Sequence, residues 1–473
     1  MPPPASLTIL GSGPAGYPAA FLAADLGLSV TLIDREDALG GTCLHRGCIP
    51  SKSLLHAARL LSDAREASAL GLDFAPPAIR LEALREWKES VTARLANGLS
   101  QLAKARRISV LHAQAALASP TQLQLTGPDG ADRSLDFDTL LLAPGSVPVL
   151  PSGFPAGHPH LWDSTAALAL PEIPPSLLVV GGGYIGLELG SVYAALGSRV
   201  TVVEMTGGLL PGLDRDLIVP LAKRLRSRLH AIHLTTRVAD IADDPSGLRA
   251  TLEDLKTGET RSEPFAKILV AVGRRPNTGD LALDRAGLAA DDRGFIPADA
   301  DGRAGQPRIY AAGDAAGNPM LAHKATHEAR ALVARLVGCP VQTSSHIPAV
   351  VFTDPEIAWV GLTETQAREQ QLDVRISKFP WAASGRAGTL NRPDGSTKLL
   401  ADPGTGKLLG VGLVGCGAGD LISEAALALD MGATAADLAR TIHPHPTLSE
   451  TLGEAAELHA GFCTHLYRPR RTS

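Results

Sequence analysis

Two cysteines, Cys43 and Cys48, lie five positions apart in the segment Gly-Gly-Thr-Cys-Leu-His-Arg-Gly-Cys-Ile-Pro-Ser-Lys at residues 40–52. On an unbroken α-helix this spacing would leave the two Cα atoms roughly 8 to 9 Å apart, too far for a disulfide bond. The two thiols can therefore join only if Gly47 and its neighbours interrupt the helical path. Such a constrained pair is easily reduced, so the segment predicts a redox-active disulfide. A structural disulfide or two unrelated buried cysteines are the alternatives.

The residues after the second cysteine favour its ionised form. Pro50 suits the first turn of a helix, which would place Cys48 near the positive end of the helix dipole. Lys52 follows one turn later, and its positive charge also favours a thiolate. The sequence therefore predicts a thiolate at Cys48.

One pattern of elements occurs twice in the chain. A short apolar strand (residues 7–10) leads into a glycine-rich turn, an apolar helix to about residue 26, and a second strand that ends in an acid. The pattern returns from residue 177, and in both copies the acid lies 23 residues after the first glycine (34 − 11 and 204 − 181). The matched residues are Gly11, Gly13, Gly16 and Asp34 in the first copy, and Gly181, Gly183, Gly186 and Glu204 in the second.

This spacing suits the binding of a dinucleotide. Glycines let the backbone approach a pyrophosphate, the helix N-terminus supplies N–H donors, and the acid accepts hydrogen bonds from ribose hydroxyls. Two copies predict two dinucleotides; ordinary glycine-rich turns of an α/β protein are the alternative. No arginine follows Glu204 to receive a 2′-phosphate, and Arg199 precedes the strand, so NAD is favoured over NADP.

A third glycine-acid signal follows Arg308 and the apolar residues 309–312. There Gly313 and Asp314 end a predicted strand. A carboxylate at such a point can face sugar-like hydroxyls, and an ordinary turn after a strand fits the same residues equally well.

The composition limits the classes of binding partner and the cellular compartment that we expect for this protein. A chain of 473 residues is long enough for about three domains, and its net charge of −5 lacks the positive field that nucleic acids and anionic membranes require. Five cysteines, an odd number, do not suggest a secreted disulfide framework, so we expect a cytoplasmic protein without a signal peptide. The apolar run at residues 177–197 contains Glu188 and, before Ser191, five glycines, which indicates a strand, a turn and a buried helix, not a membrane span.

Two further phrases narrow the family. Residues 319–325 read Pro-Met-Leu-Ala-His-Lys-Ala, and residues 443–450 read His-Pro-His-Pro-Thr-Leu-Ser-Glu. Together with the cysteine segment, the paired glycine motifs and Ala-Gly-Asp at 312–314, they resemble the dihydrolipoamide dehydrogenase family of class I pyridine nucleotide-disulfide oxidoreductases. The resemblance covers nearly the whole chain. The cysteine segment and the glycine motifs also occur in glutathione and mercuric reductases, whereas the other two phrases are more specific.

The resemblance implies two cofactors, FAD in the first unit and NAD in the second. It also implies that Lys52 and Glu188 form a pair beside the flavin ring, where a lysine would stabilise negative charge and a carboxylate would hold that lysine. The implied cofactor-binding residues are Gly11, Gly13, Gly16, Asp34, Thr42, Lys52, Gly181, Gly183, Gly186, Glu188, Glu204, Gly273, Arg274, Asp314 and Ala322.

The resemblance further implies that Cys43, Cys48, His445 and Glu450 are catalytic. A dithiol attacks a disulfide only as a thiolate, and imidazole has the right pKa to take that proton at neutral pH, so His445 suits the base. The Glu450 carboxylate is suited to orient His445, but its spacing from Thr447 fits a helix capping box equally well.

Three other histidines are interpreted as structural. His443 is expected to be a loop residue. His323 and His327 have the i,i+4 spacing of metal ligands, but no cysteine or acid cluster accompanies them. We therefore expect these two on a helix face near the flavin.

The chain departs from the family's usual pattern at a few positions. Asp34 stands where Glu is common, His45 and Arg46 where Asn-Val is common, and Pro144 where Thr is usual. We expect a slightly altered ribose contact from the first and a shifted disulfide potential from the added positive charge. None of these departures removes a required group.

The predicted fold is α/β, with two Rossmann-like dinucleotide-binding domains and a C-terminal α/β dimerisation domain. We expect an FAD domain at 1–150, an NAD domain at 151–278, a segment completing the FAD site at 279–345, and an interface domain at 346–473. The resemblance implies a homodimer in which His445 of one subunit serves the Cys43–Cys48 pair of the other.

The expected function is oxidation of protein-bound dihydrolipoamide with reduction of NAD. The expected partner is a lipoylated acyltransferase or carrier protein of a 2-oxo acid dehydrogenase complex or of the glycine cleavage system. One alternative is an NADPH-dependent reductase of another disulfide or of a metal ion, which the residues after Glu204 disfavour. A redox-silent scaffold flavoprotein is a second, which the intact thiols, lysine and histidine disfavour.

Overall fold

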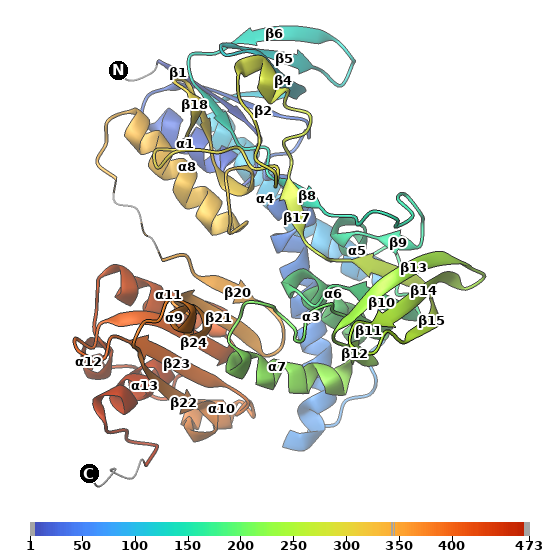
Figure 1. Cartoon of the computed structure of the whole chain (residues 1–473), viewed down its shortest axis with the longest axis vertical. Coiled ribbons are helices and arrows are strands. Elements are labelled where there is room, and N and C mark those ends of the chain that lie inside the picture. The colour runs from blue at the N-terminus through green and yellow to red at the C-terminus, as the bar shows by residue number, and fades with distance from the viewer. Residues whose placement is uncertain (1–4, 342–343, 345, 468–473) are drawn as a thin grey trace.

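The computed structural model describes residues 5–341, 344 and 346–467. It forms three α/β bodies, which lie at the top, the right and the lower left of Figure 1. The first two are each built on a mainly parallel sheet, and the C-terminal body is built on an antiparallel one. This arrangement confirms the predicted α/β class. Helix α3 (Cys48–Glu66) leaves the first body and packs along helix α6 (Tyr184–Leu196) of the second.

The first body contains a six-stranded sheet in the order β18-β19-β7-β1-β2-β3. Helices α1 (Gly16–Asp25) and α8 (Ala322–Leu336) pack on one face through small residues, while the antiparallel sheet β4-β5-β6 contributes to the core on the other face. Strands far apart in sequence therefore share one sheet. The strands of this sheet are β1 (Ser6–Leu10), β2 (Ser29–Asp34), β3 (Ser109–His112), β7 (Leu140–Leu142), β18 (Arg303–Gln306) and β19 (Ile309–Ala311). Those of the smaller antiparallel sheet are β4 (Gln114–Ser119), β5 (Gln122–Thr126) and β6 (Asp132–Asp136).

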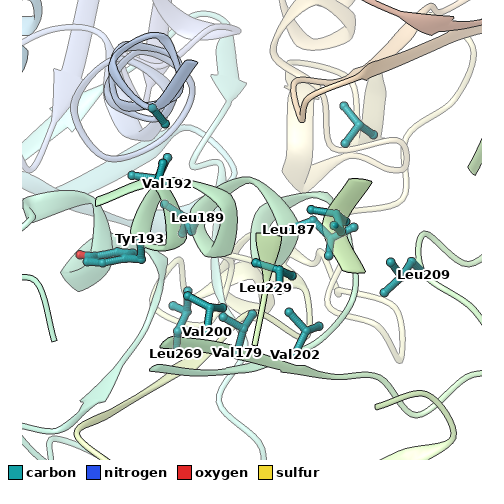
Figure 2. Close-up of a cluster of buried hydrophobic side chains, with 14 of the residues drawn as sticks. Val179, Leu187, Leu189, Val192, Tyr193, Val200, Val202, Leu209, Leu229 and Leu269 are labelled. Atoms are coloured by element: carbon teal, nitrogen blue, oxygen red, sulfur yellow. The ribbon is translucent and has the colours of Figure 1, made fainter. Parts of the chain in front are cut away.

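The second body repeats this plan with a parallel sheet in the order β12-β11-β10-β16-β9. Successive side chains of a strand point to opposite faces. Val179 thus packs under α6, beside Val200 and Leu269 (Figure 2), whereas Leu178 packs against the antiparallel sheet β13-β14-β15. The strands are β9 (Leu161–Trp162), β10 (Ser176–Val180), β11 (Arg199–Val203), β12 (Ala231–His233), β13 (Thr236–Asp244), β14 (Gly247–Asp254), β15 (Thr260–Phe265) and β16 (Lys267–Val270).

The apolar run at 177–197 is the centre of this second body. It forms β10, a glycine turn and α6, as the sequence predicts, and both elements are buried. In the described part of the chain, no helix has the length and apolar character needed to cross a membrane.

The third body contains the sheet β20-β21-β24-β23-β22 covered by helices α11, α12 and α13. A buried lysine, Lys398, ties it to the second body through Asp214 at 2.6 Å and Asp216 at 2.9 Å. The elements are β20 (Ala349–Val351), β21 (Glu356–Gly361), α9 (Glu364–Glu369), β22 (Arg375–Pro380), α10 (Gly385–Thr389), β23 (Ser396–Ala401), β24 (Leu408–Gly415), α11 (Ala418–Asp430), α12 (Ala435–Arg440) and α13 (Glu450–Ala460).

The remaining elements lie within the first two bodies or connect them. Strands β8 and β17 form a two-stranded antiparallel link between the first and second bodies. These elements are α2 (Gly41–Arg46), α4 (Leu81–Ala105), β8 (Ser146–Pro148) and β17 (Arg274–Pro276), together with α5 (Ser164–Ala169) and α7 (Arg215–Arg228), which pack in the core of the second body.

Candidate active site

The two cysteines of the predicted redox pair lie on either side of a helix break. Cys43 belongs to α2, Cys48 begins α3, and Gly47 between them leaves the helical path with φ −146° and ψ −115°. A Cβ on Gly47 would lie 2.9 Å from the Thr42 carbonyl oxygen and 3.2 Å from the Cys43 Cα. A side chain at this position would therefore press on the turn that brings the thiols together.

Both cysteines are present as thiols, and they interact. Hydrogen bonding from Cys43 lowers the pKa of Cys48 to about 7, and the positive charge of Lys52 also lowers it, while burial opposes both effects. The same hydrogen bond raises the pKa of Cys43 above its ordinary value. The position of Cys48 in the first turn of α3 adds the helix dipole as a further stabilising influence. Cys48 is therefore the thiolate of the reduced pair.

Lys52 is held beside the thiols by a buried carboxylate. Its Nζ lies 2.9 Å from Glu188 Oε2, and Glu188 is only 3% exposed. The other carboxylate oxygen accepts a hydrogen bond of 3.0 Å from the backbone N–H of Phe352, whose ring lies 4.4 Å from the Lys52 ammonium. Residues of all three bodies thus meet at this pair.

A cavity of about 590 Å³ extends from the first glycine motif to the cysteines. Its volume is typical of a cofactor site. The predicted cofactor residues that line it are Gly11, Gly13, Asp34, Thr42, Lys52, Glu188, Arg274, Asp314 and Ala322, and both cysteines line it as well.

The residues of this cavity fit the dinucleotide that the first motif predicts. Gly11 has φ +102°, and a Cβ there would lie 2.1 Å from the Ala143 carbonyl oxygen. Only glycine therefore fits where the turn after β1 approaches the backbone at Ala143. The hydroxyl of Ser12 is buried without a hydrogen-bond partner among the described residues, which leaves a polar group free for a phosphate or sugar.

The two glycine motifs hold their acids in the same way. In the first, Asp34 accepts hydrogen bonds from the backbone N–H groups of Ser12 (2.6 Å) and Glu36 (3.0 Å). In the second, Glu204 accepts from Gly182 and Thr206, both at 2.7 Å. A carboxylate has about four acceptor positions, so each acid keeps capacity for ribose hydroxyls.

The second motif lies outside the first cavity. Its α6 helix begins at Tyr184 with Gly183 as the N-cap and no side chain capping it, which leaves N–H donors for an anionic ligand. This geometry fits NAD. The predicted residues that do not line the first cavity are Gly16, Gly181, Gly183, Gly186, Glu204, Gly273, His445 and Glu450.

Arg274, which we expect near NAD from the family resemblance, lines the first cavity. Its Nε donates a 2.8 Å hydrogen bond to the Ser146 hydroxyl, which in turn donates to the Asp314 carboxylate. A chain of three polar side chains therefore reaches Asp314. Ser146 was not singled out from the sequence, where it appears only beside the unusual Pro144.

His445 and Glu450 form a close pair in the third body. The His445 Nδ1 lies 2.8 Å from Glu450 Oε1, and the other carboxylate oxygen accepts a 2.7 Å hydrogen bond from the Thr447 N–H. The imidazole is 73% exposed and does not line the cysteine cavity of its own chain. The pair is thus formed but is not joined to the thiols within one subunit.

The predicted capping box at Thr447 and Glu450 is only half present. The glutamate accepts from the Thr447 N–H, but the Thr447 hydroxyl donates to the Pro444 carbonyl. Helix α13 therefore begins later, at Glu450, with Ser449 as its N-cap. This geometry lets one carboxylate hold the loop and the imidazole together.

The other histidines occupy two different environments. His443 is nearly buried and pairs with Glu424 at 2.8 Å, which agrees with a structural role. His323 and His327, however, line a second cavity of about 760 Å³ between α8 and α11, whereas Ala322 and Ala325 of the same helix line the first. The side of α8 that faces the first cavity is therefore that of the alanines, because Ala322 and Ala325 share one side of the helix and His323 and His327 share another.

A nucleotide cavity that ends at a dithiol with an adjacent lysine and carboxylate defines a flavin- and nicotinamide-dependent disulfide oxidoreductase. The chain belongs to the pyridine nucleotide-disulphide oxidoreductase family, whose main region matches residues 5–329 and whose dimerisation domain matches residues 347–456. FAD and NAD, the cofactors expected from the sequence, are those of this family.

The curated relatives agree with this assignment. The chain is 42% identical over 461 residues to the dihydrolipoyl dehydrogenase of Haemophilus influenzae, covering 97% of this chain and 96% of that one. It is 43% identical over 452 residues to that of Thermus scotoductus, covering 95% and 96%. These matches confirm the family resemblance predicted from the motifs.

Solved structures give the same fold. LpdA from Mycobacterium tuberculosis superposes with a TM-score of 0.88 at 28% identity, covering 96% of this chain and 99% of that one. The flavoprotein disulfide reductase RclA from Escherichia coli, described as induced by HOCl, gives a TM-score of 0.84 at 28% identity, with coverage of 96% and 99%.

Proposed function

We propose that this chain oxidises dihydrolipoyl groups carried by another protein and reduces NAD, as an FAD-containing dihydrolipoyl dehydrogenase. The observation that carries the proposal is the Cys48 thiolate beside Cys43, held with the Lys52–Glu188 pair in a cavity that fits FAD. Bound FAD would take the electron pair of the reduced cysteines and pass it to NAD as hydride.

The chain's own residues would carry out the sulfur chemistry. His445 takes the proton of one substrate thiol, whose thiolate attacks Cys43 of the oxidised pair and displaces Cys48 as a thiolate. The second substrate sulfur then attacks the sulfur that is bonded to Cys43 and gives its proton to the departing Cys43, which closes the lipoyl disulfide and releases Cys43. The pair gains two electrons; of the two substrate protons, one ends on Cys43 and one on His445.

His445 must come from a partner subunit for this step. Within one chain it lies outside the thiol cavity, and its loop carries an almost fully exposed isoleucine, Ile442, at 95%. Leu427 and Met431 are exposed nearby in sequence, at 62% and 76%. An apolar surface in a family dimerisation domain supports a homodimer in which His445 of the partner subunit faces the Cys43–Cys48 pair.

The substrate is proposed to be a lipoylated acyltransferase or carrier protein of a 2-oxo acid dehydrogenase complex or of the glycine cleavage system. The cytoplasmic location expected from the sequence remains part of this proposal, because a reducing compartment would keep Cys339, Cys416 and Cys463 as thiols. The expected domains, at 1–150, 151–278, 279–345 and 346–473, likewise remain a proposal. They are supported by the return of β18 and β19 to the first sheet.

Anaerobic titration of the FAD-loaded enzyme with dihydrolipoamide tests the proposal. We expect loss of flavin absorbance and a new long-wavelength band from the thiolate at Cys48, followed by recovery of the oxidised spectrum when NAD is added. An unchanged flavin spectrum in excess dihydrolipoamide would rule the activity out.

A further inference from the structure

Four metal-ligating side chains meet at the C-terminal end of α13, away from the redox cysteines. Glu454 and Glu457 lie on the helix, and Cys463 and His465 lie on the loop that follows it. The Cys463 thiol donates to Glu454 Oε2 at 2.8 Å, and His465 Nδ1 contacts the other oxygen of the same carboxylate. One ligand atom from each of Glu454, Glu457 and Cys463 lies within 4.8 Å of the others.

The backbone holds these side chains in position. Gly461 ends α13 with φ +95°, and the chain turns back beside the last helical turn. The N–H of Phe462 then donates to the Glu457 carbonyl at 3.1 Å, and the N–H of Thr464 donates to Glu457 Oε2 at 3.1 Å. The i,i+3 spacing of the glutamates and the turn before Cys463 thus bring three ligand atoms together, and His465 contacts Glu454 beside them.

The charges of the cluster favour a cation. Among residues 5–341, 344 and 346–467, the only basic side chain that pairs with these two glutamates is His465. The Cys463 thiol donates its proton to the Glu454 carboxylate, and a metal ion would replace that proton.

A second group of acidic residues differs from the Cys463 cluster because a lysine already neutralises it. Asp214, Asp216 and Glu364 also lie within ligand distance of one another, but the buried ammonium of Lys398 occupies their centre at 2.6 to 2.9 Å. Their charge is already compensated by a permanent cation. No such lysine lies among the described partners of the Cys463 cluster.

We propose that Glu454, Glu457, Cys463 and His465 bind one Zn²⁺ ion. One sulfur, one imidazole nitrogen and two carboxylate oxygens are a tetrahedral set that suits zinc. In such a site a sulfur and an oxygen ligand lie about 3.6 Å apart, so the Cys463–Glu454 contact must open by less than about 1 Å. Binding releases the Cys463 proton, and no oxidation or reduction is involved.

A zinc ion at this end of α13 would also affect the helix that orients His445. Glu454 lies one turn beyond Glu450, which holds the His445 imidazole. Zinc would fasten the segment after α13 to the helix whose first residue orients that histidine. This inference does not depend on the proposed dithiol oxidation.

Zinc binding can be measured on the full-length FAD-loaded protein in a Cys43→Ser/Cys48→Ser background, which removes the other close thiol pair. After dialysis against Zn²⁺ and then against buffer, metal analysis should give about one zinc per subunit. Cys463→Ser should weaken binding, measured by competition with a chromogenic chelator, by at least about 100-fold. His465→Asn should weaken it less, and Cys339→Ser, which alters an exposed cysteine elsewhere, should leave it unchanged.

Co²⁺ provides a spectroscopic check. Difference spectra against the metal-free protein should show a near-ultraviolet band from thiolate bound to Co²⁺, present in the Cys339→Ser variant and absent in Cys463→Ser. Less than about 0.2 zinc per subunit in the parent, or equal affinity in the parent and in Cys463→Ser, would overturn the proposal.

Discussion

Lys52 of α3 and Glu188 of α6 form an ion pair of 2.9 Å directly beside the Cys48 thiolate. The two charges act on this thiol in opposite directions, because the Lys52 charge lowers the pKa of Cys48 and the Glu188 charge raises it. The pair is therefore both a mechanical link between two bodies and an electrostatic control of the redox centre.

Opposite substitutions in this pair should move the Cys48 pKa in opposite directions. Lys52→Met removes the stabilising cation and should raise this pKa above about 7, whereas Glu188→Gln should lower it further. Each change should amount to roughly 1 pH unit. A pH titration of the long-wavelength thiolate band in the reduced enzyme measures both, and shifts in the same direction would contradict the assigned roles.

Gly47→Ala should disturb the thiol pair without a comparable loss of fold. The new Cβ would press on the Thr42 carbonyl and Cys43, so Cys43 could no longer donate properly to Cys48. We expect the Cys48 pKa to rise towards that of an ordinary thiol. Gly98→Ala in helix α4, where a Cβ meets nothing, is the matched control and should stabilise the protein by about 1 kcal/mol in urea unfolding. Unaltered thiol titration in Gly47→Ala would show that the turn tolerates a side chain.

Cys48→Ser should bind FAD normally and lose dihydrolipoamide-dependent reduction of NAD. The reason is that the serine hydroxyl cannot form the disulfide that receives the electron pair. Flavin content is read from absorbance and turnover from NADH formation, with Cys416→Ser as a control for a cysteine outside the cavity. Full turnover in Cys48→Ser would exclude the proposed pair.

His445→Gln should separate the two halves of the reaction. Electron transfer from NADH to a dye needs no base at the dithiol and should persist, while dihydrolipoamide oxidation should fall by roughly 10²-fold or more. Glu450→Gln should have a smaller effect, since its amide keeps contact with Thr447 but stabilises the protonated imidazole less. Equal losses in both assays of His445→Gln would instead indicate a structural defect.

Glu204→Gln should weaken NAD binding selectively. The amide can still accept at one oxygen, but it cannot accept from both Gly182 and Thr206 while serving a ribose. The KM for NAD should rise by about 10-fold, corresponding to one lost charged hydrogen bond. FAD content should be unaffected, and an unchanged KM would remove Glu204 from the NAD site.

The glycine-acid motifs were predictable because their geometry is local. In each copy the acid bonds to the amide 22 residues earlier within one strand-turn-helix-strand unit, so spacing alone specifies the contact. The same holds for the break at Gly47, which follows from the distance that two cysteines must span. The structure also separates His445 from the thiols of its own chain, as the predicted exchange between subunits requires.

Contacts that depend on packing between bodies could not be read from the sequence. Nothing near Phe352 indicates that its N–H reaches Glu188, 164 residues earlier, or that Ser146 links Arg274 to Asp314. The histidines of α8 were assigned to the wrong face because a helix with two functional sides gives one periodic pattern. The Cys463 cluster was not predicted, because only the turn at Gly461 places Cys463 and His465 against the helix that carries the glutamates.

The Glu188 carboxylate, which receives Lys52 on one oxygen and the Phe352 amide on the other, has a consequence for breathing motions. An outward movement of the C-terminal body would remove the Phe352 N–H from the buried Glu188 carboxylate. The same movement would weaken the position of Lys52, which Glu188 holds. Deuterium uptake at that amide should consequently be among the slowest in the polypeptide, and any such displacement would register as a change of colour at the flavin.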